Sequence, residues 1–271
     1  MDHVAAVVFD WAGTMVDFGS RAPMGVFVEA MHRFGVEITI AEARRPMGLP
    51  KRDHIAALLA DPRIAAAWQA QHGAPPDEAS IDAVYAVFVP LNEAVAADYA
   101  DLVPGALPVV QALEARGVKI GSTTGYTRSI LTPVMERAAA LGYRPQSVVC
   151  ADDLAAGRPS PLAMYQTFAT LGVWPAWRVV KVDDTVPGIA EGRAAGCWTI
   201  GVAASGNGVG LSWTEWQALS AAEQRRLADA AAEPLRSAGA DFVIDTVADL
   251  LPALDQVNQR LAAGERPLPP V

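Results

Sequence analysis

Short runs of apolar, mostly β-branched residues recur along the chain, and each run ends at polar or glycine-containing residues that lead into a helical pattern. Runs of this length and composition are typical of buried strands. They predict six strands, at Val4–Phe9, Val118–Ser122, Val148–Cys150, Val179–Val182, Thr199–Val202 and Phe242–Ile244. Because strands that alternate with helices form parallel sheets, we expect an α/β fold with a doubly wound, mostly parallel, Rossmann-like sheet.

About a hundred residues separate the first two predicted strands, which is too many for a simple crossover. The pattern of this segment is helical, and Thr39 and Glu42 have the spacing of a capping box at the start of a helix. We therefore predict two domains: a core domain of residues 1–18 and 100–271, and an inserted helical cap domain of residues 19–99.

The composition is that of a folded, acidic protein. Of the 271 residues, 52% are hydrophobic and 19% are charged, which is enough apolar material for a sizeable core. A net charge of −9 argues against a nucleic-acid or anionic membrane surface. The two cysteines are far apart, and no basic, apolar leader or long apolar span is evident, so we expect a cytoplasmic protein with free thiols.

Polar side chains gather where the predicted strands end. Asp10 follows the first strand, Thr124 and Gly125 follow the second, and Asp183 and Asp184 follow the fourth. Because ligands of open α/β sheets bind beyond the carboxyl ends of the strands, we expect these residues to face one site. Crowded carboxylates repel each other unless a cation lies among them, and hard oxygen ligands indicate Mg²⁺.

Two further features predict an anionic ligand. Thr124 and Gly125 precede a helix that is expected to begin near Thr127, where hydroxyl and backbone N–H groups can bind a phosphate. Arg158, beside Pro159, would add a fixed positive charge. A carboxylate, a Mg²⁺ site and a phosphate pocket together favour phosphoryl transfer to an aspartate.

Asp10, Thr124, Arg158 and Asp184 resemble the four motifs of the haloacid dehalogenase superfamily. Most phosphatases of that superfamily carry a second aspartate two residues after the nucleophile, where it is the general acid for the leaving alcohol. This chain has Ala12 at that position. A simple phosphomonoesterase is therefore disfavoured.

The segment RRPMGLPKRDH, residues 44–54, offers another way to stabilise a leaving group. Gly48 and Pro50 indicate a break followed by a helix start, which places Lys51 in the first turn. The helix dipole, burial and a nearby cation all favour the neutral amine of such a lysine. A neutral amine condenses with an aldehyde to an iminium, which accepts electrons from a C–P bond without the help of an acid.

The segments FDWAGT, RRPMGLPK and GSTTGYTR together closely resemble the phosphonoacetaldehyde hydrolase (phosphonatase) family of that superfamily, and the resemblance extends to about Val202. It implies phosphonate degradation: hydrolysis of the C–P bond of phosphonoacetaldehyde to acetaldehyde and phosphate. The implied intermediates are a Schiff base on Lys51 and an aspartyl phosphate on Asp10.

The same resemblance implies the remaining site residues. Mg²⁺ would be held by Asp10, the backbone carbonyl of Ala12 and Asp184. His54 would be a proton shuttle in catalysis together with Asp10 and Lys51. The substrate would be bound by Met47, Thr124, Gly125, Tyr126 and Arg158. The family also implies a homodimer that acts on a small molecule and binds neither nucleic acid nor membrane.

Other functions stay open from the sequence alone. A metal-independent dehalogenase would also use Asp10, but it would need neither Asp184 nor Lys51. A phosphatase of the superfamily, or a non-catalytic module that binds a phosphate ligand, would use the same sheet.

Two motifs are not explained by the resemblance. The superfamily's fourth motif commonly reads Gly-Asp with a further aspartate four positions on, whereas this chain has Asp183 before Asp184 and Gly188 at the later position, so the role of Asp183 is open. The stretch GNGVG at residues 206–210 lacks the βαβ context of a dinucleotide site and is interpreted as a glycine-rich loop.

Overall fold

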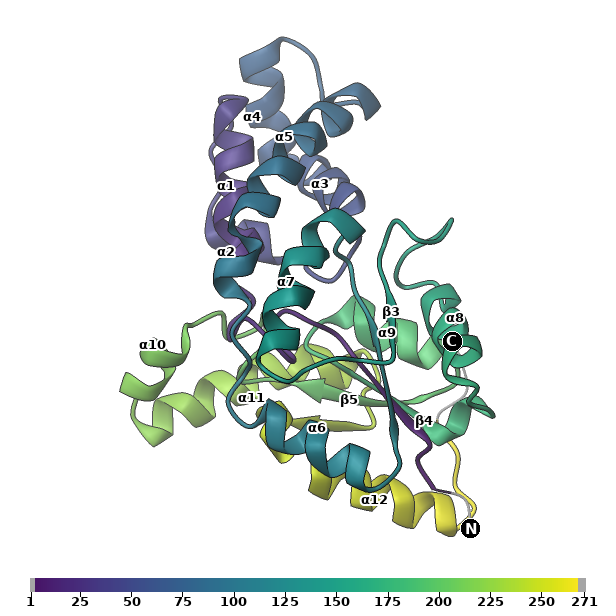
Figure 1. Ribbon diagram of the computed structural model, residues 1–271. Coiled ribbons are helices and arrows are strands. Elements are labelled where there is room, and N and C mark those ends of the chain that lie inside the picture. Colours follow the sequence, from purple (N-terminus) through teal and green to yellow (C-terminus); the bar gives the residue numbers. More distant parts are fainter. Residues whose placement is uncertain (1–2, 268–271) are drawn as a thin grey trace.

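A six-stranded, all-parallel sheet forms the centre of the molecule (Figure 1). The structure is a computed structural model that describes residues 3–267. Its strands are β1 (Ala6–Phe9), β2 (Lys119–Thr123), β3 (Ser147–Val149), β4 (Val179–Asp183), β5 (Trp198–Val202) and β6 (Phe242–Ile244), in the order β3-β2-β1-β4-β5-β6. The predicted α/β fold class is confirmed, and each strand lies within two residues of its predicted position.

The central strands are buried on both faces, which is why they are nearly continuous apolar runs. On β1, Ala6 and Val8 pack on the side of Met164 in α8, while Val7 and Phe9 belong to the larger core that contains Leu113 of α6. The chain order reverses between β1 and β4. A reversal of this kind opens a crevice at the carboxyl ends of the two strands, which is the usual ligand site of such sheets.

Of the seven helices around the sheet within residues 3–267, four begin at a Ser or Thr side chain that caps the helix, at Thr127, Thr185, Ser212 and Ser220. The seven helices are α6 (Ala106–Ala115), α7 (Arg128–Ala140), α8 (Leu162–Leu171), α9 (Val186–Ala194), α10 (Trp213–Ala218), α11 (Ala221–Ser237) and α12 (Leu250–Ala262), with short 3₁₀ turns at Ala97–Tyr99, Ala176–Arg178 and Val247–Asp249.

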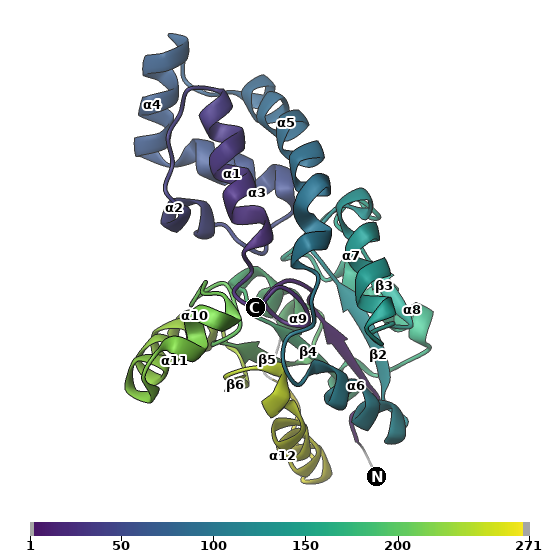
Figure 2. The same cartoon turned by 60° about the vertical axis from the view of Figure 1, so that its left-hand side comes forward.

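Five helices form a separate group at the carboxyl end of the sheet, at the top of Figure 1 and Figure 2. They are α1 (Ala22–Arg33), α2 (Ile40–Arg44), α3 (Lys51–Ala60), α4 (Pro62–His72) and α5 (Glu78–Ala96). The predicted capping box of Thr39 and Glu42 is present at the start of α2. The division into a cap of residues 19–99 and a core stays a prediction, and residues 1–2 and 268–271 of the predicted core lie outside the described residues.

One helix within residues 3–267, α5 with its 3₁₀ extension to Tyr99, is long and apolar enough to cross a membrane by length and composition alone. It packs against α1, α3 and α7. A single helix of this kind is weak evidence for a membrane span, because a helix within a folded protein passes the same test.

Stacked aromatic rings fill the interior of the helical group. The rings of Phe27 and Phe88 are 4.2 Å apart, and Phe27 also stacks on His54 at 3.9 Å. All three side chains are fully buried. Since His54 lies in α3, this stack helps to hold the helix that begins with Lys51.

Phe88→Ala should lower the free energy of unfolding by about 3–5 kcal/mol, because it removes a fully buried ring and leaves a cavity against Phe27. Chemical denaturation followed by circular dichroism measures the loss. Phe88→Leu, which keeps most of the volume, should lose less than the alanine variant. Equal losses would show that ring packing does not hold this group of helices together.

Candidate active site

Three carboxylates meet at the crevice between β1 and β4. Asp10 follows β1, Asp183 ends β4, and Asp184 comes next. One oxygen of each lies within 4.8 Å of the others, and all three side chains are buried. Burial, and then repulsion from Asp183, raises the pKa of Asp10 to about 6; burial, Asp10 and Asp183 raise the pKa of Asp184 well above its usual range. The donor set is all oxygen and carries unbalanced negative charge, so it fits a metal ion.

A buried ion network supports these carboxylates. The Arg158 guanidinium lies 2.8 Å from Asp10, 3.2 Å from Asp183 and 3.1 Å from Glu191. Lys181 lies 3.1 Å from Asp183 and 3.2 Å from Glu191. Two cations, Arg158 and Lys181, thus face the four carboxylates of Asp10, Asp183, Asp184 and Glu191, so negative charge remains in excess.

Lys181 and Glu191 were not predicted as part of the site. The signal was present, because Lys181 interrupts the apolar run Val179–Val182 and is fully buried. A lysine in the middle of a buried parallel strand needs a charged partner. The partner Glu191, on α9, could not be identified from the sequence.

The geometry around Gly188 explains the unusual fourth motif. A Cβ atom at this position would lie 2.0 Å from the Asp183 carboxylate. That carboxylate is fixed by the Thr185 N–H and hydroxyl, which donate to its Oδ1 at 3.0 and 2.7 Å. Asp183 therefore occupies the space beside residue 188, and only glycine fits there.

The loop after β2 carries polar groups to the same crevice. Thr124 is buried, and its Oγ1 accepts a hydrogen bond from the Tyr126 N–H at 3.1 Å. Thr127 caps α7, so the positive end of that helix lies next to the loop. The predicted helix start near Thr127 is confirmed: α7 begins at Arg128, and Thr127 is its N-cap.

Lys51 is the first residue of α3 and is buried beside the carboxylates. Its Nζ lies 3.9 Å from Met47 Sδ and 4.8 Å from the ring centre of Tyr126. Burial is the main cause that lowers the pKa of Lys51, to about 8; Asp10 acts in the opposite direction. Within residues 3–267, no carboxylate lies at ion-pair distance from this amine.

A small cavity joins these groups. Its lining residues are Asp10, Ala12, Ser20, Met47, Gly48, Lys51, Thr124, Gly125, Tyr126, Arg158 and Thr185. The structure thus brings eight predicted site residues together around one space, with Asp184 beside it through the carboxylate cluster. Ser20, Gly48 and Thr185 were not predicted, and they come from loops that only the tertiary fold brings near.

His54 is the predicted site residue that the structure does not bring to the cavity. Its Nε2 lies 2.8 Å from the Ala43 carbonyl, and its ring stacks on Phe27. Burial, followed by Lys51, lowers the pKa of His54 to about 3, so the ring is neutral and Nε2 is the donor. The shuttle role stays a prediction, and no contact with the cavity supports it.

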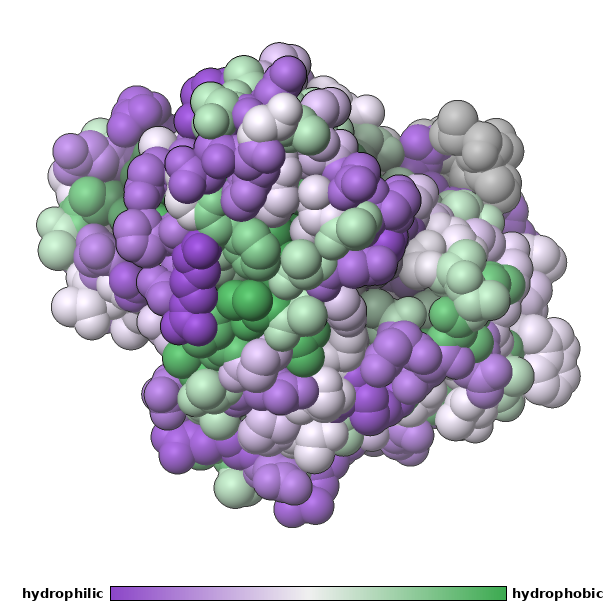
Figure 3. All heavy atoms as spheres, turned by 90° about the horizontal axis from the view of Figure 1, so that it is seen from above, coloured by the Kyte–Doolittle hydropathy of each residue, from purple (hydrophilic) through white to green (hydrophobic). Residues whose placement is uncertain are grey.

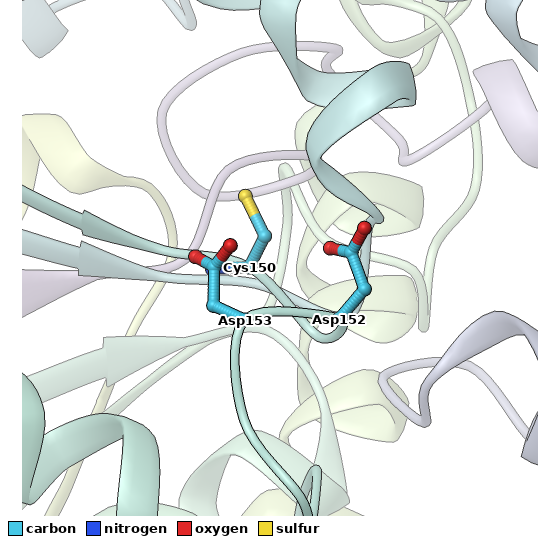
Figure 4. Close-up of side chains that lie close together, drawn as sticks. All are labelled: Cys150, Asp152 and Asp153. Carbon is cyan, nitrogen blue, oxygen red and sulfur yellow. The ribbon is translucent and has the colours of Figure 1, made fainter.

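A second acidic group, Cys150, Asp152 and Asp153, lies in the loop after β3 (Figure 4). Asp152 accepts a hydrogen bond from the Arg128 N–H at the start of α7, at 2.7 Å. Asp153 accepts one from the Cys150 N–H at 2.7 Å and pairs with the Arg128 guanidinium. These bonds give the group a structural role in shaping the loop.

Lys51→Met should raise the melting temperature at pH 7 in the absence of divalent cations. The folded pKa of about 8 lies below the ordinary value of 10.5, so folding is penalised while the buried amine is protonated, by on the order of 3 kcal/mol. The penalty is full below about pH 8 and fades as the pH rises toward 10.5. The gain from Lys51→Met should therefore shrink at about pH 10.

Lys119→Met, at an exposed lysine, is the control and should show no such gain. Melting curves at several pH values compare the two variants with the unmodified protein. If Lys51→Met melts at a lower temperature than the unmodified protein at every pH, burial of the protonated amine does not penalise folding.

Comparisons with known proteins show the family of this chain. A family model described as haloacid dehalogenase-like hydrolase matches residues 4–196. The chain is 54% identical to a phosphonoacetaldehyde hydrolase of Paraburkholderia xenovorans, over 98% of this chain and all of that protein, and 49% identical to one of Aeromonas hydrophila, over 97% and 95%. A crystal structure of a phosphonoacetaldehyde hydrolase like protein from Oleispira antarctica superposes with a TM-score of 0.96 at 44% identity, covering 97% of this chain and 96% of that one. The chain therefore belongs to the phosphonoacetaldehyde hydrolase family of the haloacid dehalogenase-like hydrolases.

Proposed function

We propose that this protein hydrolyses the C–P bond of phosphonoacetaldehyde to acetaldehyde and phosphate. The observation that carries the proposal is the buried Lys51 amine, which lines the same small cavity as Asp10. Ala12 stands two residues after Asp10, so the cavity offers an amine and no acid at that position. The relatives that carry this activity in their names match over the whole chain.

Lys51 binds the aldehyde. Because its pKa is lowered to about 8, a useful fraction of the amine is neutral near pH 7. The neutral amine adds to the aldehyde carbon, and loss of water leaves an iminium. Met47 and Tyr126, which lie against Nζ, surround the two-carbon unit and exclude water from it.

Asp10 is the nucleophile that attacks phosphorus. Its carboxylate attacks phosphorus and forms an O–P bond, while the electron pair of the C–P bond moves into the iminium and gives an enamine. The enamine carbon then takes a proton. One water molecule hydrolyses the resulting imine and releases acetaldehyde, and a second hydrolyses the aspartyl phosphate. Since imine formation released one water, the net reaction consumes one.

The phosphonate group lies between Arg158 and the loop of Thr124 and Gly125, all of which line the cavity. We assign Mg²⁺ to the carboxylates of Asp10 and Asp184 and the carbonyl of Ala12. When bound, the ion supplies positive charge that offsets the repulsion between the phosphonate and the carboxylates. Asp183 pairs with Arg158 and Lys181 and holds both side chains in place.

Three broader proposals accompany the activity. The five-helix group is a cap domain of residues 19–99, which covers the cavity and carries Lys51 to it. The enzyme acts in the cytoplasm on a small molecule. It is a homodimer; Figure 3 shows an apolar patch among hydrophilic residues on the upper face, a surface that could form the contact.

Reduction with borohydride in the presence of phosphonoacetaldehyde should trap the substrate carbon on Lys51 and abolish activity. Peptide mapping by mass spectrometry locates the adduct. Lys51→Arg keeps the charge but cannot form the imine, so it should lower kcat by at least about 10³-fold and give no adduct.

The controls separate the proposal from the alternatives. Lys119→Arg should leave trapping unchanged, and EDTA should abolish turnover of the unmodified enzyme. A metal-independent dehalogenase would resist EDTA, and a binding module would show no turnover at all. An adduct on Lys119 or Lys181, or full activity of Lys51→Arg, would overturn the proposed mechanism.

A further inference from the structure

The glycine-rich loop Gly206–Gly210 lies directly against the carboxylate cluster. The Asn207 N–H donates to Asp184 Oδ2 at 2.8 Å, and a Cβ atom on Gly206 would lie 2.5 Å from the Cβ of Asp184. The loop follows β5, the neighbour of β4, so this contact comes from the adjacent strand of the sheet. The orientation of Asp184 therefore depends on the position of this loop.

Arg44, at the end of α2, inserts its guanidinium into the outer side of the same loop. Nη1 donates to Asn207 Oδ1 at 3.0 Å, and Nη2 donates to the Gly210 carbonyl at 3.1 Å. Asn207 in turn donates from Nδ2 to the Arg44 carbonyl at 3.3 Å. Nη1 also reaches the Gly19 carbonyl at 3.0 Å, in the segment that leads into α1.

The shape of the loop fits this guanidinium. Gly210 has φ +71°, and a Cβ atom there would lie 2.6 Å from the Arg44 guanidinium carbon. The acceptors at hydrogen-bond distance are neutral oxygens arranged around a flat, forked donor. A guanidinium can donate to several such oxygens at once, and an ammonium group cannot match this geometry.

The chain between Arg44 and Lys51 approaches the core closely at Gly48 and Leu49. A Cβ atom on Gly48 would be 2.3 Å from Thr185 Oγ1, and one on Gly125 would be 2.7 Å from the Leu49 carbonyl. Met47, in the middle of this segment, contacts the Lys51 amine at 3.9 Å. Arg44 anchors one end of a short, tightly packed segment, and the amine lies at the other end.

We propose that Arg44 is a positioning residue that links the cap to the metal-binding carboxylate. Its bonds to the loop hold the segment 44–51 on the core, so that Lys51 enters the cavity, and they hold the loop in the position from which Asn207 orients Asp184. The link rests on the proposed function for its catalytic consequence, but its structural part does not depend on the identity of the substrate.

Hydrogen–deuterium exchange with mass spectrometry tests the structural part. The full chain is compared with Arg44→Ala in buffer containing MgCl₂ and inorganic phosphate. The exchange rates of peptides that cover residues 44–51 and 205–211 should both rise by about fivefold or more in the variant. Without the Arg44 side chain, neither segment is held by the other, so both open more often. Arg45→Ala is the matched control: its exposed side chain pairs with Asp61 on the cap, and its exchange should equal that of the unmodified protein.

Steady-state kinetics with phosphonoacetaldehyde test the catalytic part. Arg44→Ala should raise KM about tenfold or more, because only those molecules in which residues 44–51 lie against the core form the imine. Arg44→Lys should show a similar rise. Asn207→Ala should show a smaller one, since it keeps the N–H that donates to Asp184 and loses only the side-chain bonds.

The outcomes separate the two proposals. Changed exchange in Arg44→Ala, in a protein that does not act on phosphonoacetaldehyde, would support the link and overturn the proposed function. Exchange and kinetics of Arg44→Ala equal to those of Arg45→Ala would overturn the link. If Arg44→Ala does not fold, Asn207→Ala carries the same comparison, and unchanged exchange in that variant would overturn the link as well.

Discussion

Unbalanced negative charge at the carboxyl edge of the sheet is the constraint on which the site depends. Arg158 and Lys181 supply two positive charges to the four carboxylates of Asp10, Asp183, Asp184 and Glu191, so negative charge remains in excess. Buried carboxylates of this kind are stable only with a cation or a proton nearby, which is why burial and mutual repulsion raise the pKa of Asp10 and Asp184. The same unbalanced charge fits the crevice for a metal ion.

Burial has a second consequence at Lys51. Burial of this amine away from water favours its neutral, nucleophilic form. The fold pays for this in stability, since the protonated amine is penalised in the folded state at neutral pH. The same buried environment thus shifts the pKa of Asp10 and Asp184 in one direction and the pKa of Lys51 in the other. Low polarity raises the pKa of the acids and lowers that of the base.

Much of the architecture could be predicted because its causes are local. The six strands follow from apolar runs, and Asp10 and Thr124 could be placed around one space because parallel strands end at one edge. The contacts that fill the site are not local. Arg158 reaches Asp10 across 148 residues, and the Arg44–Asn207 contact spans 163. Helical spacing placed His54 near Lys51, but the spacing could not show that the ring faces Phe27 and the Ala43 carbonyl, away from the cavity.

The anchoring of Lys51 shows why such distant contacts are needed. A carboxylate beside the amine would fix its position, but it would also raise the pKa of the amine and keep it protonated. The amine therefore has to be held by groups without charge, and its contacts are the sulfur of Met47 and the ring of Tyr126. Such contacts are weakly directional, so the precision of the site must come from the backbone that carries Lys51. Close packing at Gly48 and Gly125 provides that precision, and it requires that residues 44–51 be held firmly against the sheet's loops at some point away from the amine.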